Sequence, residues 1–242
     1  MRPNTLTGFA ALLLTALVSA SAQQPAPAKP QVVPAVAQTK ETQAAITPGM
    51  ALQMLKDGNA RFVSGTMKKR DLTKQVKATG AGQFPFASIV SCMDSRASPE
   101  LVFDQGIGDV FSPRVAGNFV NDDIIGSLEY GSGAAGAKLI VVLGHSDCGA
   151  VKGACDNVKL GDLLPATLIS IKPAINAVPD DGSPRTSKNH AFVQRVAEMN
   201  VTLAVKRIRD KSSLLRGMAD TGKIKIVGAM LDVETGKVSF LE

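Results

Sequence analysis

Two short segments hold most of the reactive side chains of this 242-residue chain, at residues 91–96 (SCMDSR) and 144–149 (GHSDCG). A catalytic zinc site has three protein ligands and one open position, and thiolate and imidazole are both suitable donors. Cys92, His145 and Cys148 provide such a set. The His-x-x-Cys spacing lets the chain turn around one ion, while Cys92 approaches from a separate segment.

The same cysteines allow a second interpretation. An exported protein with three cysteines commonly contains one disulfide and one remaining thiol, so Cys92 and Cys148 could instead be joined. Cys155 lies seven residues after Cys148, which on one helix separates their Cα atoms by about 10 Å. That distance is too long for a disulfide. We therefore expect Cys155 to be a buried or spare thiol, and we assign no role to His190.

Asp94 and Arg96 lie two positions apart, directly after Cys92. They can form a charge-assisted, bidentate pair that fixes the orientation of a carboxylate beside a metal. The alternative is a surface salt bridge, which contributes little to stability. The position next to Cys92 favours the first interpretation.

Both reactive segments follow runs of apolar and β-branched residues that are typical of buried parallel strands. Strands are expected at 86–91, 138–143 and 223–230, with a weaker candidate at 109–115 because Pro113 removes a ladder hydrogen bond. Helices are expected from Thr47-Pro48 onward and at 122–129, 150–155 and 189–209, and a turn at 233–238 leads into a final edge strand. This order predicts an α/β fold, a mostly parallel central sheet of four to five strands flanked by helices. Ligands bind at the carboxyl ends of strands in such sheets.

The N-terminal region has a different composition from the rest of the chain. Residues 1–22 have the pattern of a secretion signal, and residues 23–46 are rich in Pro, Ala and Gln, as expected for a disordered linker. The catalytic domain is expected at 47–242. With no later apolar run long enough to span a membrane, we expect an exported protein, in the periplasm if the cell is diderm. One Tyr, no Trp and scattered basic residues argue against nucleic-acid binding.

The two motifs, Cys-x-Asp-x-Arg at 92–96 and Gly-His-x-x-Cys-Gly at 144–149, resemble those of the β-class carbonic anhydrases in type, order and separation. The resemblance extends through residues 103–111, 114–118, 127–130 and 228–237, and covers nearly all of residues 47–242. It implies the β-carbonic anhydrase fold. The absence of Trp and the presence of Gln83 resemble the plant-like branch of that family.

The resemblance also implies roles for individual residues. One Zn²⁺ per chain would be bound by Cys92, His145 and Cys148. Asp94 would pair with Arg96 in an open site, and would become the fourth zinc ligand in a closed one. The residues implied for the substrate pocket are Gln83, Phe111, Ala116, Tyr130 and Gly149. Because neighbouring subunits share such pockets in the family, a homodimer or a dimer of dimers is implied.

The implied reaction is the reversible hydration of carbon dioxide to bicarbonate and a proton by zinc-bound hydroxide. Two alternatives stay open. The same site could hydrolyse carbonyl sulfide or carbon disulfide, or the chain could be a non-catalytic exported protein that binds metal or is linked by a disulfide.

Overall fold

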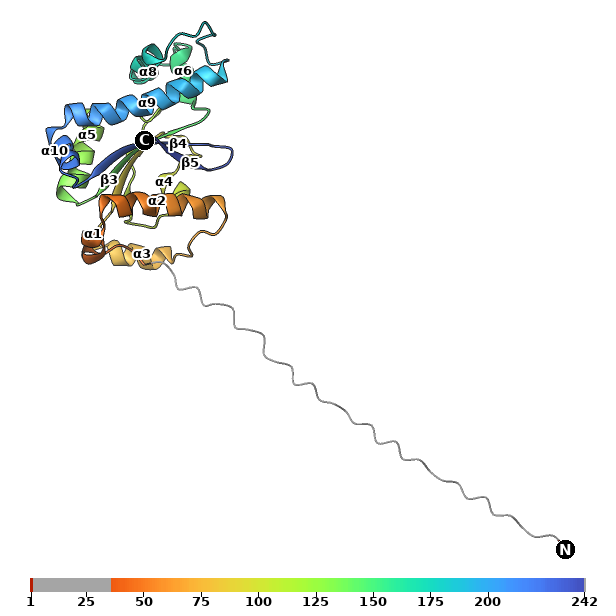
Figure 1. Ribbon diagram of the computed structural model, residues 1–242, viewed down its shortest axis with the longest axis vertical. Helices are drawn as coiled ribbons and strands as arrows, with labels where there is room; N and C mark the ends of the chain where they lie inside the picture. The colour runs from red at the N-terminus through yellow and green to blue at the C-terminus, as the bar shows by residue number, and fades with distance from the viewer. Residues whose placement is uncertain (2–35, 242) are drawn as a thin grey trace. The chain divides into compact units, whose positions relative to one another are not determined.

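A computed structural model describes residue 1 and residues 36–241 of the chain, and residues 36–241 belong to one compact unit. The expected secretion signal, beyond its first residue, and residues 23–35 of the expected linker lie outside the described residues. Within the described part, five strands form one sheet in the order β2-β1-β3-β4-β5. Figure 1 shows this sheet between two groups of helices.

The strands are β1 (Ala87–Ser91), β2 (Val110–Phe111), β3 (Leu139–His145), β4 (Lys225–Leu231) and β5 (Val238–Leu241). The first four are parallel, and β5 pairs antiparallel with β4 at the edge. Every residue of β1 and β3 is buried, as their continuous apolar sequences predict. The expected α/β fold with a mostly parallel sheet is therefore confirmed.

Strand β2 is shorter than the expected strand at 109–115. Beyond Phe111 the chain still runs beside β1, where Ser91 N donates to the Pro113 carbonyl at 3.0 Å and Ser91 pairs with Arg114 in an isolated bridge. Proline has no N–H to donate, so regular pairing stops before it. This irregular continuation brings residues 114–118 close to the end of β1.

Helices cover both faces of the sheet (Figure 1). One group is α1 (Lys40–Ala45), α2 (Pro48–Val63), α3 (Leu72–Thr79) and α4 (Pro99–Val102). The other is α5 (Asp122–Glu129), the π-helix η1 (Tyr130–Ala134), α6 (Gly149–Cys155), α7 (Leu164–Ile169), α8 (Lys172–Ala177), α9 (His190–Lys211) and α10 (Ser213–Asp220). Among the described residues, no helix combines the length and the apolar character that crossing a membrane requires.

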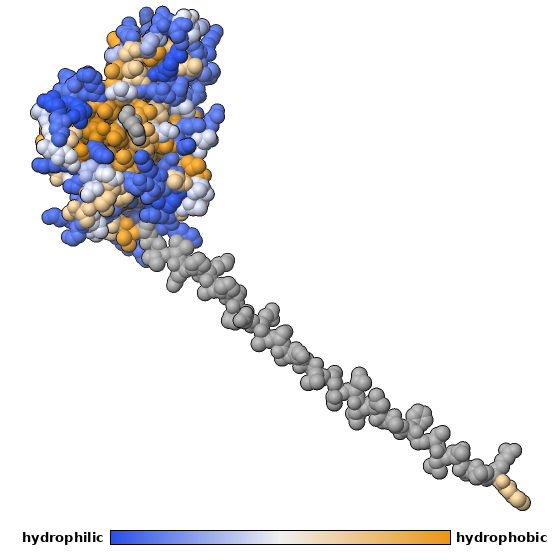
Figure 2. Space-filling model, viewed as in Figure 1, coloured by the Kyte–Doolittle hydropathy of each residue, from blue (hydrophilic) through white to orange (hydrophobic). Residues whose placement is uncertain are grey.

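Two hydrophobic clusters pack against the sheet, following the alternation of side chains along each strand. Ile89 and Val141 belong to the cluster that includes Leu55 of α2. Val90 and Val142 belong to the cluster that includes residues of α5, α6 and α9. Figure 2 shows an apolar area on the face of the molecule that lies between α9 and α2 in Figure 1. The sheet is thus packed on both faces, and it holds the two reactive segments at the ends of β1 and β3.

The described structure begins with a helix inside the expected linker. Thr39 caps α1 in a capping box, and Gln43 is buried and donates to the carbonyls of Pro85 (2.7 Å) and Ala135 (2.8 Å). We expected the folded part to start at Thr47, and it starts earlier, at α1. Composition could not predict this, because α1 is anchored by one polar side chain rather than by an apolar stripe. Helix α2 itself begins as expected, with Thr47 Oγ1 accepting from Met50 N.

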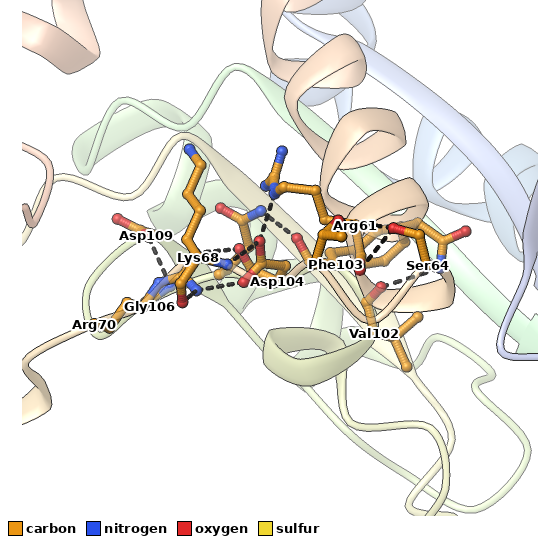
Figure 3. Close-up of polar contacts among 12 residues, drawn as sticks. Arg61, Ser64, Lys68, Arg70, Val102, Phe103, Asp104, Gly106 and Asp109 are labelled. Carbon is orange, nitrogen blue, oxygen red and sulfur yellow. Dashed lines mark hydrogen bonds and ion pairs between the residues drawn. The ribbon is translucent and has the colours of Figure 1, made fainter. Parts of the chain in front are cut away.

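A buried ion network joins α2 and the segment after it to the segment that precedes β2 (Figure 3). The Asp104 carboxylate, which is fully buried, accepts from Arg61 Nε at 2.5 Å, from Lys68 N at 3.2 Å and from Arg70 Nη1. Burial raises the pKa of this carboxyl, but Arg61 and Arg70 outweigh that effect and lower it. Because a buried charge is stable only when it is paired, this network fixes the path of the chain into β2.

Candidate metal centre

Cys92, His145 and Cys148 come together at the carboxyl end of the sheet. Cys92 follows the last residue of β1, His145 is the last residue of β3, and Cys148 is the N-cap of α6. Their ligand atoms all lie within 4.8 Å of one another, and all three residues are buried. Ser91 pairs with Leu143 in the parallel ladder, so the two reactive segments leave adjacent strands at almost the same level.

The His145 ring has one nitrogen committed to the protein and one that faces the sulfurs. Nδ1 lies 2.8 Å from the Ser146 carbonyl oxygen, and since a carbonyl only accepts, Nδ1 carries the proton and donates it. Nε2 is buried and has no hydrogen-bond partner among the described residues. Its lone pair is therefore available to a metal, the usual arrangement of a metal-binding histidine.

The two cysteines are free thiols in the structure. The two sulfurs lie within 4.8 Å of each other, and their interaction lowers the pKa of the Cys92 thiol and raises the pKa of the Cys148 thiol. Burial opposes a positive charge on His145, but Cys92, the Ser146 carbonyl and Asp94 together raise its pKa. Two buried sulfurs this close cannot both carry a negative charge at low cost unless a cation lies between them. A divalent cation would compensate two thiolates here, so this donor set fits zinc.

Asp94 and Arg96 form the bidentate pair that the sequence indicated. Arg96 Nε donates to Asp94 Oδ1 at 2.9 Å and Arg96 Nη2 donates to Oδ2 at 2.8 Å, while the Arg96 backbone N–H adds a third bond. These bonds hold the pKa of the Asp94 carboxyl well below its usual range. Asp94 Oδ2 lies 3.9 Å from His145 Nε2, so the carboxylate borders the metal centre while Arg96 holds it.

Arg114 has a part in this site that the sequence did not indicate. Its Nε donates to the Cys92 carbonyl at 3.0 Å and its Nη2 donates to the Asp94 carbonyl at 2.6 Å. Arg114 thereby fixes the backbone of the loop that carries both side chains. Arg114 does open the 114–118 segment that resembles the family, but an arginine directly after a proline in a strand-like segment does not by itself indicate this role.

The expected pocket residues fall into three groups. The rings of Phe111 and Tyr130 contact each other with centroids 6.2 Å apart, and Tyr130 is 59% exposed. Ala116 directly precedes Gly117, whose N–H donates to Cys92 Sγ. Gly149 directly follows Cys148. Gln83 is exposed, four residues before β1.

The two reactive residues left without a role stay outside the cluster. Cys155 is buried at the end of α6, and burial raises the pKa of its thiol to about 11. His190 is exposed at the start of α9, where its Nδ1 lies 4.0 Å from Asp147 Oδ1. The expectation of Cys155 as a buried thiol is therefore confirmed.

Comparisons with known proteins agree with this geometry. A family model described as carbonic anhydrase matches residues 87–238. Carbonic anhydrase 2 of Mycobacterium tuberculosis is 34% identical over 195 residues, which cover 78% of this chain and 91% of that protein. The fold is similar to that of a Coccomyxa β-carbonic anhydrase in complex with acetazolamide, with a TM-score of 0.60, 25% identity, and coverage of 68% of this chain and 75% of that one.

A second solved structure shares the fold at lower identity. It comes from a study of two tetrameric β-carbonic anhydrases from Sordaria macrospora, with a TM-score of 0.58, 23% identity, and coverage of 70% of this chain and 90% of that one. The family match spans both strands that end in the metal centre and the helix that Cys148 caps. The chain belongs to the β-class carbonic anhydrase family of enzymes.

Proposed function

We propose that Cys92, His145 and Cys148 bind one zinc ion per chain, and that the chain catalyses the reversible hydration of carbon dioxide to bicarbonate and a proton. The observation that carries this proposal is the buried cluster of two thiols and a free imidazole Nε2, all within 4.8 Å. Zinc, when bound, supplies a Lewis acid that makes hydroxide available from water near neutral pH.

The residues around the metal centre hold the ligands in their binding forms. The Ser146 carbonyl accepts a hydrogen bond from His145 Nδ1–H, which selects the neutral tautomer whose Nε2 is unprotonated. The Gly117 N–H donates to Cys92 Sγ at 3.3 Å, and the backbone N–H groups of Val151 and Ala150 lower the pKa of the Cys148 thiol against the effect of burial, so both thiolates are stabilised. These contacts support a site built for a cation.

Asp94 and Arg96 are the proposed catalytic pair. Held by Arg96, the Asp94 carboxylate stays ionised at working pH and accepts a hydrogen bond from the attacking oxygen. Arg96 also keeps the carboxylate turned away from the open ligand position. If that pair separates, Asp94 is free to become the fourth ligand, which would close the site.

Phe111, Ala116 and Tyr130 are the proposed apolar wall for carbon dioxide, with Gln83 and Gly149 as polar contacts. Gln83 and Tyr130 are exposed in the single chain, which supports a pocket completed by a second subunit. A homodimer or a dimer of dimers is proposed, and the tetrameric relatives from Sordaria macrospora support it.

The test of this function is a comparison of gases on the purified enzyme. We expect stopped-flow measurements with a pH indicator to give kcat/KM for carbon dioxide above about 10⁶ M⁻¹s⁻¹, within the usual range of efficient enzymes. Carbonyl sulfide and carbon disulfide should turn over far more slowly. Faster turnover of either sulfur compound would assign the site to that reaction, and no turnover of any gas by zinc-loaded protein would favour a non-catalytic role.

The proposed place of this reaction is outside the cytoplasm, in the periplasm of a diderm cell. This proposal depends on the signal-like residues 1–22 alone.

A further inference from the structure

The backbone N–H of Gly117 donates to Cys92 Sγ at 3.3 Å. Gly117 has φ +83°, a left-handed conformation that glycine adopts readily. A Cβ at this position would lie 2.6 Å from Cδ1 of Ile171, the N-cap of α8, so packing also favours glycine. The position of this N–H therefore depends on how the 116–118 backbone is held.

Asn200 fixes that backbone through a direct hydrogen bond. This residue of α9 is only 4% exposed, and its Nδ2 donates to the Gly117 carbonyl at 2.8 Å. Asn200 and Cys92 therefore contact the same glycine, one through its carbonyl and the other through its N–H. Since α9 packs on β3 and β4, this bond ties the Gly117 backbone to the rigid part of the fold.

We propose that Asn200 is a positioning residue of the metal centre. By fixing Gly117, it aims the Gly117 N–H at Cys92 Sγ and so limits how strongly this thiolate donates charge to the metal. A hydrogen bond to a ligating atom tunes the metal and orients the ligand even though it does not touch the metal. This inference rests on the proposed zinc site.

The surroundings of Asn200 decide which substitution is most informative. Asn200 lines a surface cavity of about 580 Å³ together with Phe119, Val120 and Leu203. In Asn200→Ala, water from this cavity can replace the lost amide and partly preserve the Gly117 position. In Asn200→Asp the size is kept, but an acceptor faces the Gly117 carbonyl and repels it. Asn200→Asp should therefore have the larger effect.

The matched control is Asn59, another buried asparagine whose side-chain amide donates hydrogen bonds to backbone carbonyls. It is 5% exposed, and its Nδ2 donates to the carbonyls of Val102 (3.0 Å) and Gly236 (2.8 Å). It belongs to α2, whose Leu55 lies in the opposite hydrophobic cluster from that of Cys92. Asn59→Asp should lower Tm without changing the metal centre.

The experiment uses the whole enzyme with Co²⁺ in place of zinc, and a separate competition titration with Zn²⁺. In Asn200→Asp we expect the thiolate-to-cobalt charge-transfer band to move to longer wavelength, because Cys92 Sγ loses its N–H donor and donates more charge. We expect the zinc Kd to rise about 10-fold or more, because Cys92 is then less well oriented, as in other losses of outer contacts. Asn200→Ala should shift the band and the zinc Kd in the same directions but by smaller amounts. If Asn200→Asp does not fold, Asn200→Ala is the variant that tests the proposal.

Unchanged band and zinc Kd in the folded Asn200 variants, or equal changes in Asn59→Asp, would overturn the assignment. A failure of the proposed zinc site looks different. In that case the wild-type protein itself would show no thiolate-to-cobalt band.

Discussion

Cys148→Ser is expected to lose its zinc and about 10³-fold or more of kcat/KM for carbon dioxide hydration. A serine hydroxyl does not ionise near neutral pH, so the substitution leaves Cys92 and His145 as the only donors of the cluster. Loss of an outer contact already costs about 10- to 100-fold in metal affinity or activity, so loss of a ligand should cost more. Metal analysis and stopped-flow kinetics on the same preparation measure both effects.

Cys155→Ser is the matched control for this variant. It makes the same chemical change in a buried cysteine on the same helix, seven residues away and outside the cluster. Cys155→Ser should keep its zinc and most of its activity, with at most a small loss of stability. If the two variants lost zinc and activity equally, Cys148 would not be a ligand and the change would reflect damage to α6.

Arg96→Ala is expected to retain zinc and to lose about 10²-fold in kcat/KM, in the range for removing a partner of a metal-site residue. Arg96 supplies three hydrogen bonds to Asp94, and it is the largest cause of the lowered pKa of that carboxyl. Without it, the Asp94 pKa rises towards its ordinary value, so activity should begin to fall at a higher pH on acidification. The freed carboxylate can also occupy the open ligand position.

Arg195→Ala provides the comparison for an ordinary ion pair. Arg195 Nη1 lies 2.8 Å from Asp181 Oδ2, and both side chains are more than 40% exposed. Such surface pairs contribute little, so Arg195→Ala should keep the activity and the pH profile of the wild type. A pH profile of Arg96→Ala that matched the wild type would show that Arg96 does not govern Asp94.

Local sequence patterns predicted the parts of this molecule that depend on local chemistry. Buried strands have recognisable apolar runs, and both reactive segments directly follow such runs, so the meeting of Cys92 with His145 and Cys148 could be expected from parallel strand ends. The Asp94–Arg96 pair was also predictable, because the two residues lie two positions apart and need no distant partner.

The parts that sequence patterns missed depend on contacts between distant residues. Arg114 reaches Cys92 across 22 positions, Asn200 reaches Gly117 across 83, and Gln43 holds α1 through carbonyls 42 and 92 positions away. Each is a polar side chain bonded to backbone, and such bonds leave no periodic signal. The truncation of β2 had a visible cause in Pro113, but only the structure showed where pairing stopped.

The most direct test of the zinc site is metal analysis combined with thiol titration of the native protein. The proposed zinc site predicts about one zinc per chain, with Cys92 and Cys148 protected from thiol reagents until a chelator removes the metal and hydration activity together. A metal-free protein in which Cys92 and Cys148 form a disulfide would contradict it.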